Sequence, residues 1–189
     1  EDQPVTFDVL GNDTRADGDP LANATIASVG QPTHGRVTIV PEKDVLSIDS
    51  GSYNSGDQIT VTVNGVSVTY TLNTGITLAA NMQAFATQIA GNTAMSAVVT
   101  AAEVDGELVL TSARPGTPIN SSATAPTNTG GFTLDVSNLQ PNGRLTYTPD
   151  ANYNGVDTFT YTVSNGATPP SFDTATVTID VTAVNDNPD

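Results

Sequence analysis

The chain has 189 residues, 37% of them hydrophobic, and a formal charge of −15 from 20 acidic and 5 basic residues. Such a charge makes nucleic acid and anionic membrane surfaces poor partners, and the lack of cysteine excludes disulfides, thiol catalysis and zinc fingers. No apolar run approaches the roughly 20 residues of a membrane span. The acidity fits either calcium binding, since hard cations prefer carboxylate and carbonyl oxygens, or a merely soluble surface.

The first 44 residues predict short β-strands. Apolar and Thr-rich runs at 5–10, 24–29 and 35–40 are separated by "GNDTRADGDP" and "GQPTHG". Gly, Pro, Asn and Asp in those separators are the residues that tight turns require.

Residues 45–137 change character. "DQITVTVNGVSVTYTL" alternates around Asn-Gly, which predicts a hairpin because Asn and Gly accept positive φ values. "SAVVTAAEVDGELVLTS" predicts a second hairpin around Asp-Gly. Between them, "TLAANMQAFATQIAGN" predicts a helix that begins after an N-cap at Thr77 and stops at Gly91. Its apolar stripe consists of Leu78, Met82, Phe85 and Ile89. The expected order is β-β-α-β-β, a small α+β unit.

The segment 113–130 is rich in Pro, Ser, Thr and Gly and predicts a long polar loop. The following "GFTLDVSNL" is either the last strand of the middle region or a strand that returns to the outer region. Residues 141–183 resume the first style, and Phe159, Tyr161 and Val163 alternate with threonines as in a half-buried antiparallel strand.

The outer regions together predict one β-sandwich. Residues 1–44 and 138–189 contain too few strands separately and about seven in combination, which suits an antiparallel sandwich. We therefore expect a mainly β fold, with a cadherin-like or Ig-like host at 1–44 plus 138–189. An α+β module at 45–137 would be inserted at a hairpin tip, where the backbone is solvated.

Four stretches carry a family resemblance: "EDQPVTFDVLGNDTRADGDPL", "ASVGQPTHGRVTI", "GRLTYTPDANYNGVDTFTYTV" and "ATVTIDVTAVNDNP". They resemble the cadherin-like, immunoglobulin-type tandem repeats of large bacterial surface adhesins, among them RTX-type adhesins. "VNDNP" is also similar to the calcium-bearing linker of cadherins, although Ala183 stands where an Asp would precede it. The middle region, through "GDQITVTVNG" and "GELVLTSARPGTPI", resembles small modules inserted in flagellar hook-associated and other bacterial surface proteins.

The resemblance implies calcium as cofactor at the ends of the domain. The implied ligands are Glu1, Asp2, Asp17, Asp19, Asn185, Asp186, Asn187 and Asp189, with Asn12, Asp13 and Asp157 as secondary candidates. The spacing of Asp17-Gly18-Asp19 lets one turn offer two carboxylates to an ion. The alternative is a hydrophilic turn whose Asx side chains bond the backbone, in which Arg15 could pair with a carboxylate.

Other residues favour structural roles. In "PDANYNGVDTFTY", Asn-Gly makes a turn, Tyr153 caps the core and Asp157 bonds backbone at the start of a strand. His34 in "PTHG" fits a tight turn better than catalysis. Three glutamates lie in polar hairpin or loop contexts without the apolar pocket that raises a catalytic pKa: Glu42, Glu103 and Glu107. We do not expect an enzyme.

The expected function is a calcium-rigidified extender of an extracellular bacterial adhesin, supporting cell adhesion or biofilm formation. Its partners would be neighbouring repeats of the same chain, with no nucleic acid and no membrane insertion, and the isolated chain would be monomeric. The alternative is a ligand-binding module in which the middle region contacts a glycan, a protein or a neighbouring cell. Tyr53 and Tyr70 are the aromatic residues there that could stack on a sugar.

Overall fold

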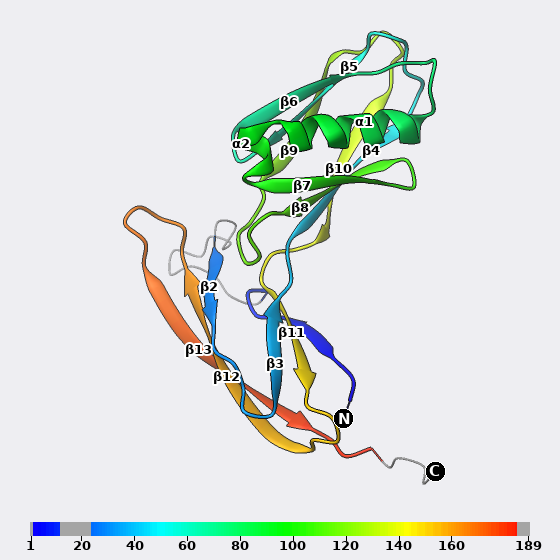
Figure 1. Ribbon diagram of the computed structural model, residues 1–189. Helices are drawn as coiled ribbons and strands as arrows, with labels where there is room; N and C mark the ends of the chain where they lie inside the picture. The colour runs from blue at the N-terminus through cyan, green and yellow to red at the C-terminus, as the bar shows by residue number, and fades with distance from the viewer. Residues whose placement is uncertain (1, 12–23, 185–189) are drawn as a thin grey trace. The chain divides into compact units, whose positions relative to one another are not determined.

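The computed structural model describes residues 2–11 and 24–184 (Figure 1). The chain forms two compact units. Unit 1 comprises Glu1–Val40, Pro115–Pro118 and Asn142–Asp189, and unit 2 comprises Pro41–Arg114 and Ile119–Pro141. Each unit has its own hydrophobic core, so each satisfies the basic condition for an independent structural domain.

Unit 1 is a sandwich of two three-stranded antiparallel sheets, ordered β1-β11-β3 and β13-β12-β2. The strands are β1 (Val5–Asp8), β2 (Thr25–Val29), β3 (Gly35–Ile39), β11 (Arg144–Pro149), β12 (Gly155–Ser164) and β13 (Phe172–Val181). Both sheets contribute to one core, where Leu145 and Tyr147 of the first meet Phe159 and Tyr161 of the second. The rings of Phe7 and Phe159 lie 6.2 Å apart across the sandwich.

The alternation expected for residues 157–163 is confirmed on β12. Asp157, Phe159 and Tyr161 are buried, whereas Thr158 and Thr160 are exposed. Successive side chains of a strand point to opposite faces, so this period of two places the aromatic rings in the core.

Unit 2 contains two further antiparallel sheets, ordered β10-β4-β8-β7 and β6-β5-β9. Its elements are β4 (Lys43–Ser50), β5 (Gln58–Val63), β6 (Val66–Thr71), α1 (Leu78–Gly91), α2 (Thr93–Ser96), β7 (Val99–Val104), β8 (Glu107–Ser112), β9 (Ser121–Thr127) and β10 (Thr133–Gln140). Helix α1 packs on β7, β8 and β6. With unit 1, this makes the whole fold mainly β, as the sequence predicts.

The predicted apolar stripe of the helix is confirmed. Met82, Phe85 and Ile89 are at most 1% exposed, and Leu78 packs against the same core from its edge. The ring of Phe85 stacks on Tyr70 of β6 at 5.2 Å between centroids. The stripe therefore covers the core of unit 2, which is what a helix needs to bury against a sheet.

The helix also begins and ends where its capping residues predict. The Thr77 hydroxyl accepts a hydrogen bond from the Ala80 N–H at 3.2 Å, the usual N-cap geometry. Gly91 is the last helical residue, and Asn92 follows as the C-cap. Asn92 also serves as the N-cap of α2, because its side chain accepts from the Met95 N–H.

Both predicted hairpins are present. Asn64 and Gly65 join β5 to β6 with φ values of 49° and 82°, and Asp105 and Gly106 join β7 to β8 with 52° and 89°. Two successive positive φ values define the type I′ turn that matches the twist of paired strands.

Two expectations about the middle region need correction, and one open alternative is decided. The polar loop predicted at 113–130 contains β9, which pairs with β5, so the expected β-β-α-β-β order lacks strands. Its Ser- and Thr-rich sequence hid the strand, because only the small side chains of Ala123 and Ala125 reach the core. The segment "GFTLDVSNL" forms β10 and pairs with β4 of unit 2, which decides between the two alternatives.

The boundaries between the two units also differ from those predicted, which lay between residues 44 and 45 and between residues 137 and 138. The chain passes into unit 2 at Pro41 and leaves it at Asn142, and Pro115–Pro118 belongs to unit 1. There Gly116 accepts a hydrogen bond through its carbonyl oxygen from the Ile26 N–H at 2.8 Å. The described part of unit 1 holds six strands, where about seven were expected.

Replacing Phe85 with Ala should test the core of unit 2. The side chain is fully buried, so F85A is expected to lower the free energy of unfolding by about 3 to 5 kcal/mol. Urea denaturation followed by circular dichroism measures this change. The control Q83A alters an exposed position of the same helix and should stay within about 0.5 kcal/mol of wild type. Equal losses in both variants would contradict the packing described for α1.

Candidate functional site

Both described ends of the chain emerge at the same end of unit 1 (Figure 1). The first strand, β1, begins there and the last strand, β13, ends there. Gln3 and Thr182, which flank these two strands, line the same groove. The N-terminal and C-terminal segments that carry predicted calcium ligands therefore leave unit 1 from one place.

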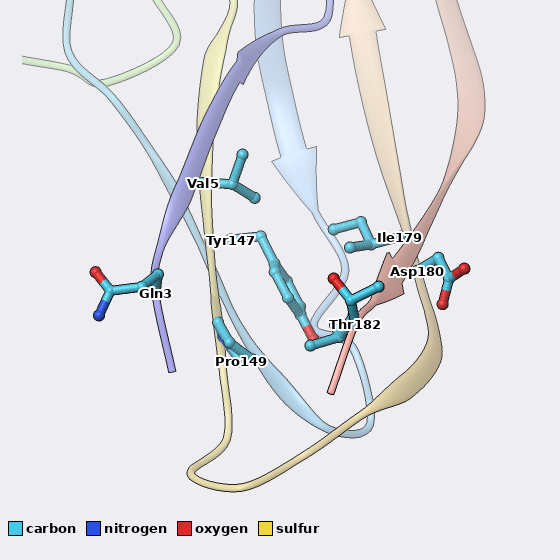
Figure 2. Close-up of a pocket in the computed structure, with 8 residues that line it drawn as sticks. Gln3, Val5, Tyr147, Pro149, Ile179, Asp180 and Thr182 are labelled. Atoms are coloured by element: carbon cyan, nitrogen blue, oxygen red, sulfur yellow. The ribbon is translucent and has the colours of Figure 1, made fainter. Parts of the chain in front are cut away.

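Figure 2 shows this groove, which has a volume of about 320 Å³. It lies between β1 of one sheet and β13 of the other. Its lining residues are Gln3, Val5, Tyr147, Pro149, Ile179, Asp180, Val181 and Thr182. Val5 points into it and is 46% exposed. The apolar lining comes from core-facing side chains that neither sheet covers completely at this edge.

Asp2 is the one first-choice calcium ligand among the residues that the structure describes. Its carboxylate accepts a hydrogen bond from the Asn152 N–H at 2.9 Å. Its φ of 63° is unusual for a residue with a side chain. Asn152, with φ 61°, lies in the turn between β11 and β12, so Asp2 is held against that turn.

Asp157, a secondary candidate, is committed to hydrogen bonds within unit 1. It is 4% exposed and accepts from the N–H groups of Thr33, His34 and Thr158 and from the Tyr147 hydroxyl, all at 2.9–3.2 Å. Burial alone would raise the pKa of this carboxyl, but the backbone donors and the Tyr147 hydroxyl outweigh it, so the pKa is lowered. This arrangement is the structural role that the sequence indicated.

The same network raises the pKa of Tyr147 to about 12, through burial and the neighbouring Asp157 carboxylate. The Tyr147 hydroxyl also lies 3.2 Å from the His34 carbonyl. The exposed imidazole of His34 stacks on Tyr153 at 4.3 Å between centroids. His34 thus belongs to a turn, as its sequence context predicts.

The remaining predicted ligands fall outside the described residues: Glu1, Asn12, Asp13, Asp17, Asp19, Asn185, Asp186, Asn187 and Asp189. The residues that flank 12–23 lie at the far end of β1 from Asp2, since the Val9 N–H donates to the Gly143 carbonyl. Within 2–11 and 24–184, no three His, Asp or Glu side chains come together as a metal site would require.

Unit 2 contains a buried acidic pair that the sequence analysis missed. Glu42, expected in a polar loop or hairpin, is 6% exposed, and Asp44 is 4% exposed. Glu42 accepts from the Ile119 N–H at 2.7 Å and from the Asn138 side-chain amide at 2.8 Å. One signal in the sequence could have indicated this burial. Glu42, Asp44 and Leu46 are spaced two residues apart, and side chains at that spacing point to the same face of an extended chain, on which Leu46 belongs to the core.

Asp44 is less well satisfied than Glu42. One carboxylate oxygen accepts from the Ser121 hydroxyl, whereas Oδ1 is buried and has no hydrogen-bond partner among the described residues. Burial raises the pKa of both carboxyls, and the Asp44 charge raises that of Glu42 further against its hydrogen bonds. The negative form of this pair is therefore costly in the folded protein.

Asp57 shows the opposite behaviour. It is fully buried and accepts from the Asn54, Thr129 and Gly130 N–H groups and from the Thr129 hydroxyl. Burial opposes ionisation, but these donors lower the pKa to about 2. The Asp57 carboxylate thus holds the turn before β5 against the segment that follows β9. The local sequence "NSGDQ" gives no sign of this distant contact.

The tyrosines that could have bound a sugar have internal partners. The Tyr70 hydroxyl donates to Asn81 Oδ1 at 3.2 Å, and the Asn81 amide donates to the Tyr53 hydroxyl at 3.4 Å. Asn81 is fully buried, and both tyrosines pack against the core. Both side chains thus take part in the packing and hydrogen bonding of unit 2.

The two antiparallel sheets of unit 1 around one core define an immunoglobulin-type sandwich. The chain belongs to the bacterial Ig domain family, whose model matches residues 1–73 and 77–182. These segments run through both units and do not distinguish them. No curated protein matches the chain. Neither described helix is long and apolar enough to cross a bilayer.

The buried carboxyls predict a maximum of stability in mildly acidic solution. Asp57 and Asp157 have folded pKa values below the ordinary 3.8, so their contribution is present above about pH 4 and is lost as the pH falls further. Glu42 and Asp44 have folded pKa values above the ordinary 4.5 and 3.8. The stability that their protonated forms contribute is therefore complete below pH 4.5 and pH 3.8, respectively, and is lost as the pH rises through the folded pKa. Urea titrations from pH 7 to pH 3 should show the unfolding free energy first rising and then falling.

The variant D44N separates the acidic pair from the overall charge. Its unfolding free energy should rise less than that of wild type between pH 7 and about pH 4.5, because one carboxyl no longer takes up a proton. The exposed Asp105 offers the control D105N. If D44N and wild type show parallel pH profiles, Asp44 does not have a raised pKa.

Removing the Asp157 carboxylate should destabilise unit 1. D157A leaves three N–H donors and a buried hydroxyl without their acceptor, at an expected cost of about 3 kcal/mol or more. Thermal unfolding and amide exchange in β11 and β12 measure the loss. D173A removes an exposed carboxylate from the adjacent strand and should change the free energy by less than about 0.5 kcal/mol.

Proposed function

We propose that this chain is a non-catalytic extender module of a bacterial cell-surface adhesin and that calcium stiffens its joints. Bacterial Ig domains are typically structural or adhesive modules of extracellular proteins. The joints would connect neighbouring repeats of the same polypeptide, in an RTX-type adhesin that supports cell adhesion or biofilm formation.

The convergence of the two ends carries the calcium part of the proposal. Gln3 and Thr182 line one groove, two residues after Glu1 and three before Asn185. Asp2 is already fixed beside that groove by its bond to Asn152. Carboxylates collected at one place repel each other unless a cation neutralises them, and calcium accepts six to eight oxygen ligands.

The described side chains support a structural role over catalysis. The buried carboxyls Asp57 and Asp157 each accept four hydrogen bonds from the protein itself, which leaves them fixed as anchors. Tyr147 lines the groove, and its hydroxyl donates a hydrogen bond to Asp157. The acid of the groove, Asp180, is exposed at its rim. An active site would instead expose a perturbed acid or base to a bound substrate.

The position of unit 2 supports its origin as an insertion. Strands β3 and β11 pair antiparallel up to Ile39 and Leu145, and the Val40 N–H donates to the Arg144 carbonyl. Unit 2 begins at the next residue, Pro41. It thus occupies the place of a hairpin connection, where an added segment leaves the ladder of the host intact.

Calcium should raise the melting temperature of the chain. A dissociation constant of about 0.1 to 1 mM is typical of extracellular modules, and at about 10 mM calcium it stabilises by about 1.4 to 2.7 kcal/mol. This corresponds to a rise of about 3 to 10 °C for a chain of this size. Differential scanning calorimetry with calcium and with EDTA measures the rise, and equal melting temperatures would sink the calcium proposal.

Variants identify which end binds. D2N combined with D186N should abolish the calcium-dependent rise if the ions lie where the two ends converge, whereas D17N combined with D19N tests the segment between β1 and β2. D105N changes an exposed acid in unit 2 and serves as the control. Retention of the full rise in both double variants would place the ions elsewhere.

A further inference from the structure

Unit 1 has two sides at which its sheets end. The sheets are ordered β1-β11-β3 and β13-β12-β2, so β1 and β13 are the edges that flank the groove. The opposite edges are β2 and β3, which contact each other. A short segment, Pro115–Pro118, lies against these two strands, and we call it the strap. It belongs to unit 1, although β8 before it and β9 after it belong to unit 2.

The strap gives the edge strand β2 a partner. Among the described strands, β2 pairs with β12 alone. The Ile26 N–H of β2 donates to the Gly116 carbonyl oxygen of the strap at 2.8 Å, so this N–H is satisfied outside the sheet. Ile26 is 4% exposed and belongs to the core of unit 1. Covering an edge with a loop is one of the ways in which proteins keep it from pairing with another chain.

Gly116 is the strap residue that approaches both sheets. It is buried, and its φ of 84° is one that glycine adopts without strain. A Cβ at this position would lie 2.7 Å from the Ile26 carbonyl oxygen and 3.4 Å from Ile39 Cγ2. Ile26 belongs to β2 and Ile39 to β3, so the main chain of Gly116 closes the seam between the two sheets. A residue with a side chain has no room there.

The residues that flank the strap are held by Glu42. The Ser112 N–H donates to the Glu42 carbonyl oxygen at 2.9 Å, and the Ile119 N–H donates to the Glu42 carboxylate at 2.7 Å. Ile119 is 4% exposed and belongs to the core of unit 2. The strap itself begins and ends with proline, which fixes φ near −65°. These restraints reduce the conformational freedom that the strap loses when it docks.

We infer that the β2–β3 side of unit 1 is a seat for a Pro-Gly-Thr-Pro segment, that the strap of the same chain is its occupant, and that the stability of unit 1 depends on this occupant. The competing view is a connecting loop that contributes nothing to unit 1. In the inferred arrangement, the polypeptide between β8 and β9 supplies a part that the host sandwich lacks on this side. The inference depends neither on calcium nor on a role as extender.

Gly116→Ala tests the seat. The added methyl group should lower the melting temperature of unit 1 by at least about 3 °C and speed hydrogen exchange at the Ile26 N–H at least about 10-fold. Thermal unfolding followed by NMR at amides of β11 and β12 measures the first effect. Gly106→Ala is the matched control, because Gly106 has a similar φ of 89° but a Cβ there meets nothing within 4 Å. It carries the same backbone strain and should leave exchange at Ile26 unchanged.

A second variant loosens the strap without adding a clash. Replacing both Pro115 and Pro118 with Ser increases the conformational freedom of the undocked strap. Exchange at the Ile26 N–H should then rise about 3-fold or more. Pro126→Ser is the control, since Pro126 is exposed on β9 of unit 2 and lies outside the strap.

Three results would overturn the inference. Exchange at Ile26 that is unchanged in both strap variants would show that the seat is not occupied. Faster exchange at Ile26 with an unchanged melting temperature of β11 and β12 would show that unit 1 does not depend on the strap. Equal effects of Gly116→Ala and Gly106→Ala at Ile26 would assign the effect to backbone strain. All measurements are made in EDTA, so the failure of the calcium proposal leaves this test unaffected.

Discussion

The fold of unit 1 depends on the buried carboxylate of Asp157. It lies on β12 of one sheet and accepts hydrogen bonds from Tyr147 of the other and from the turn between β2 and β3, which connects the sheets. A charge in the core is favourable only when such donors replace water. Four donors meet this condition here, and in doing so they fix both the spacing of the sheets and the end of the sandwich where the groove lies.

The buried acids among the described residues are of two kinds, and unit 2 contains both. Asp157 and Asp57 are fully hydrogen-bonded and keep their charge at neutral and mildly acidic pH, so they act as anchors there. Glu42 and Asp44 are buried together, and an oxygen of Asp44 has no partner among the described residues, so their charge is a cost. Glu42 is the second residue of unit 2 along the chain. Its carboxylate accepts hydrogen bonds from Ile119 and Asn138, which lie close in sequence to the residues 118/119 and 141/142 where the chain again passes between the units. Protonation therefore relieves the cost of the Glu42–Asp44 pair, whereas it weakens the anchors Asp57 and Asp157.

The sequence predicted the parts of this fold that depend on local pattern. The alternation around Phe159, the stripe at Phe85 and the Asn64-Gly65 turn are each determined within a few residues, and all are confirmed. Strand β9 escaped prediction because its contribution is main-chain pairing with β5, which polar side chains do not reveal. The partners of Glu42 and the two donors to Asp157 from the β2–β3 turn lie 77 to 124 residues away along the chain. Most of the predicted calcium ligands fall outside the described residues, so only Asp2 and Asp157 could be placed.

The closed ladder between β3 and β11 has a mechanical consequence. A pull on the two ends of the chain is transmitted through the strands of unit 1, and the bond from Val40 to Arg144 keeps residues 41–141 out of the line of tension. Once that ladder has opened and unit 2 itself has unfolded, the same residues add roughly 340 Å of extended chain, at about 3.4 Å per residue. Under tension, the length stored in unit 2 becomes available only after the β3–β11 ladder has opened.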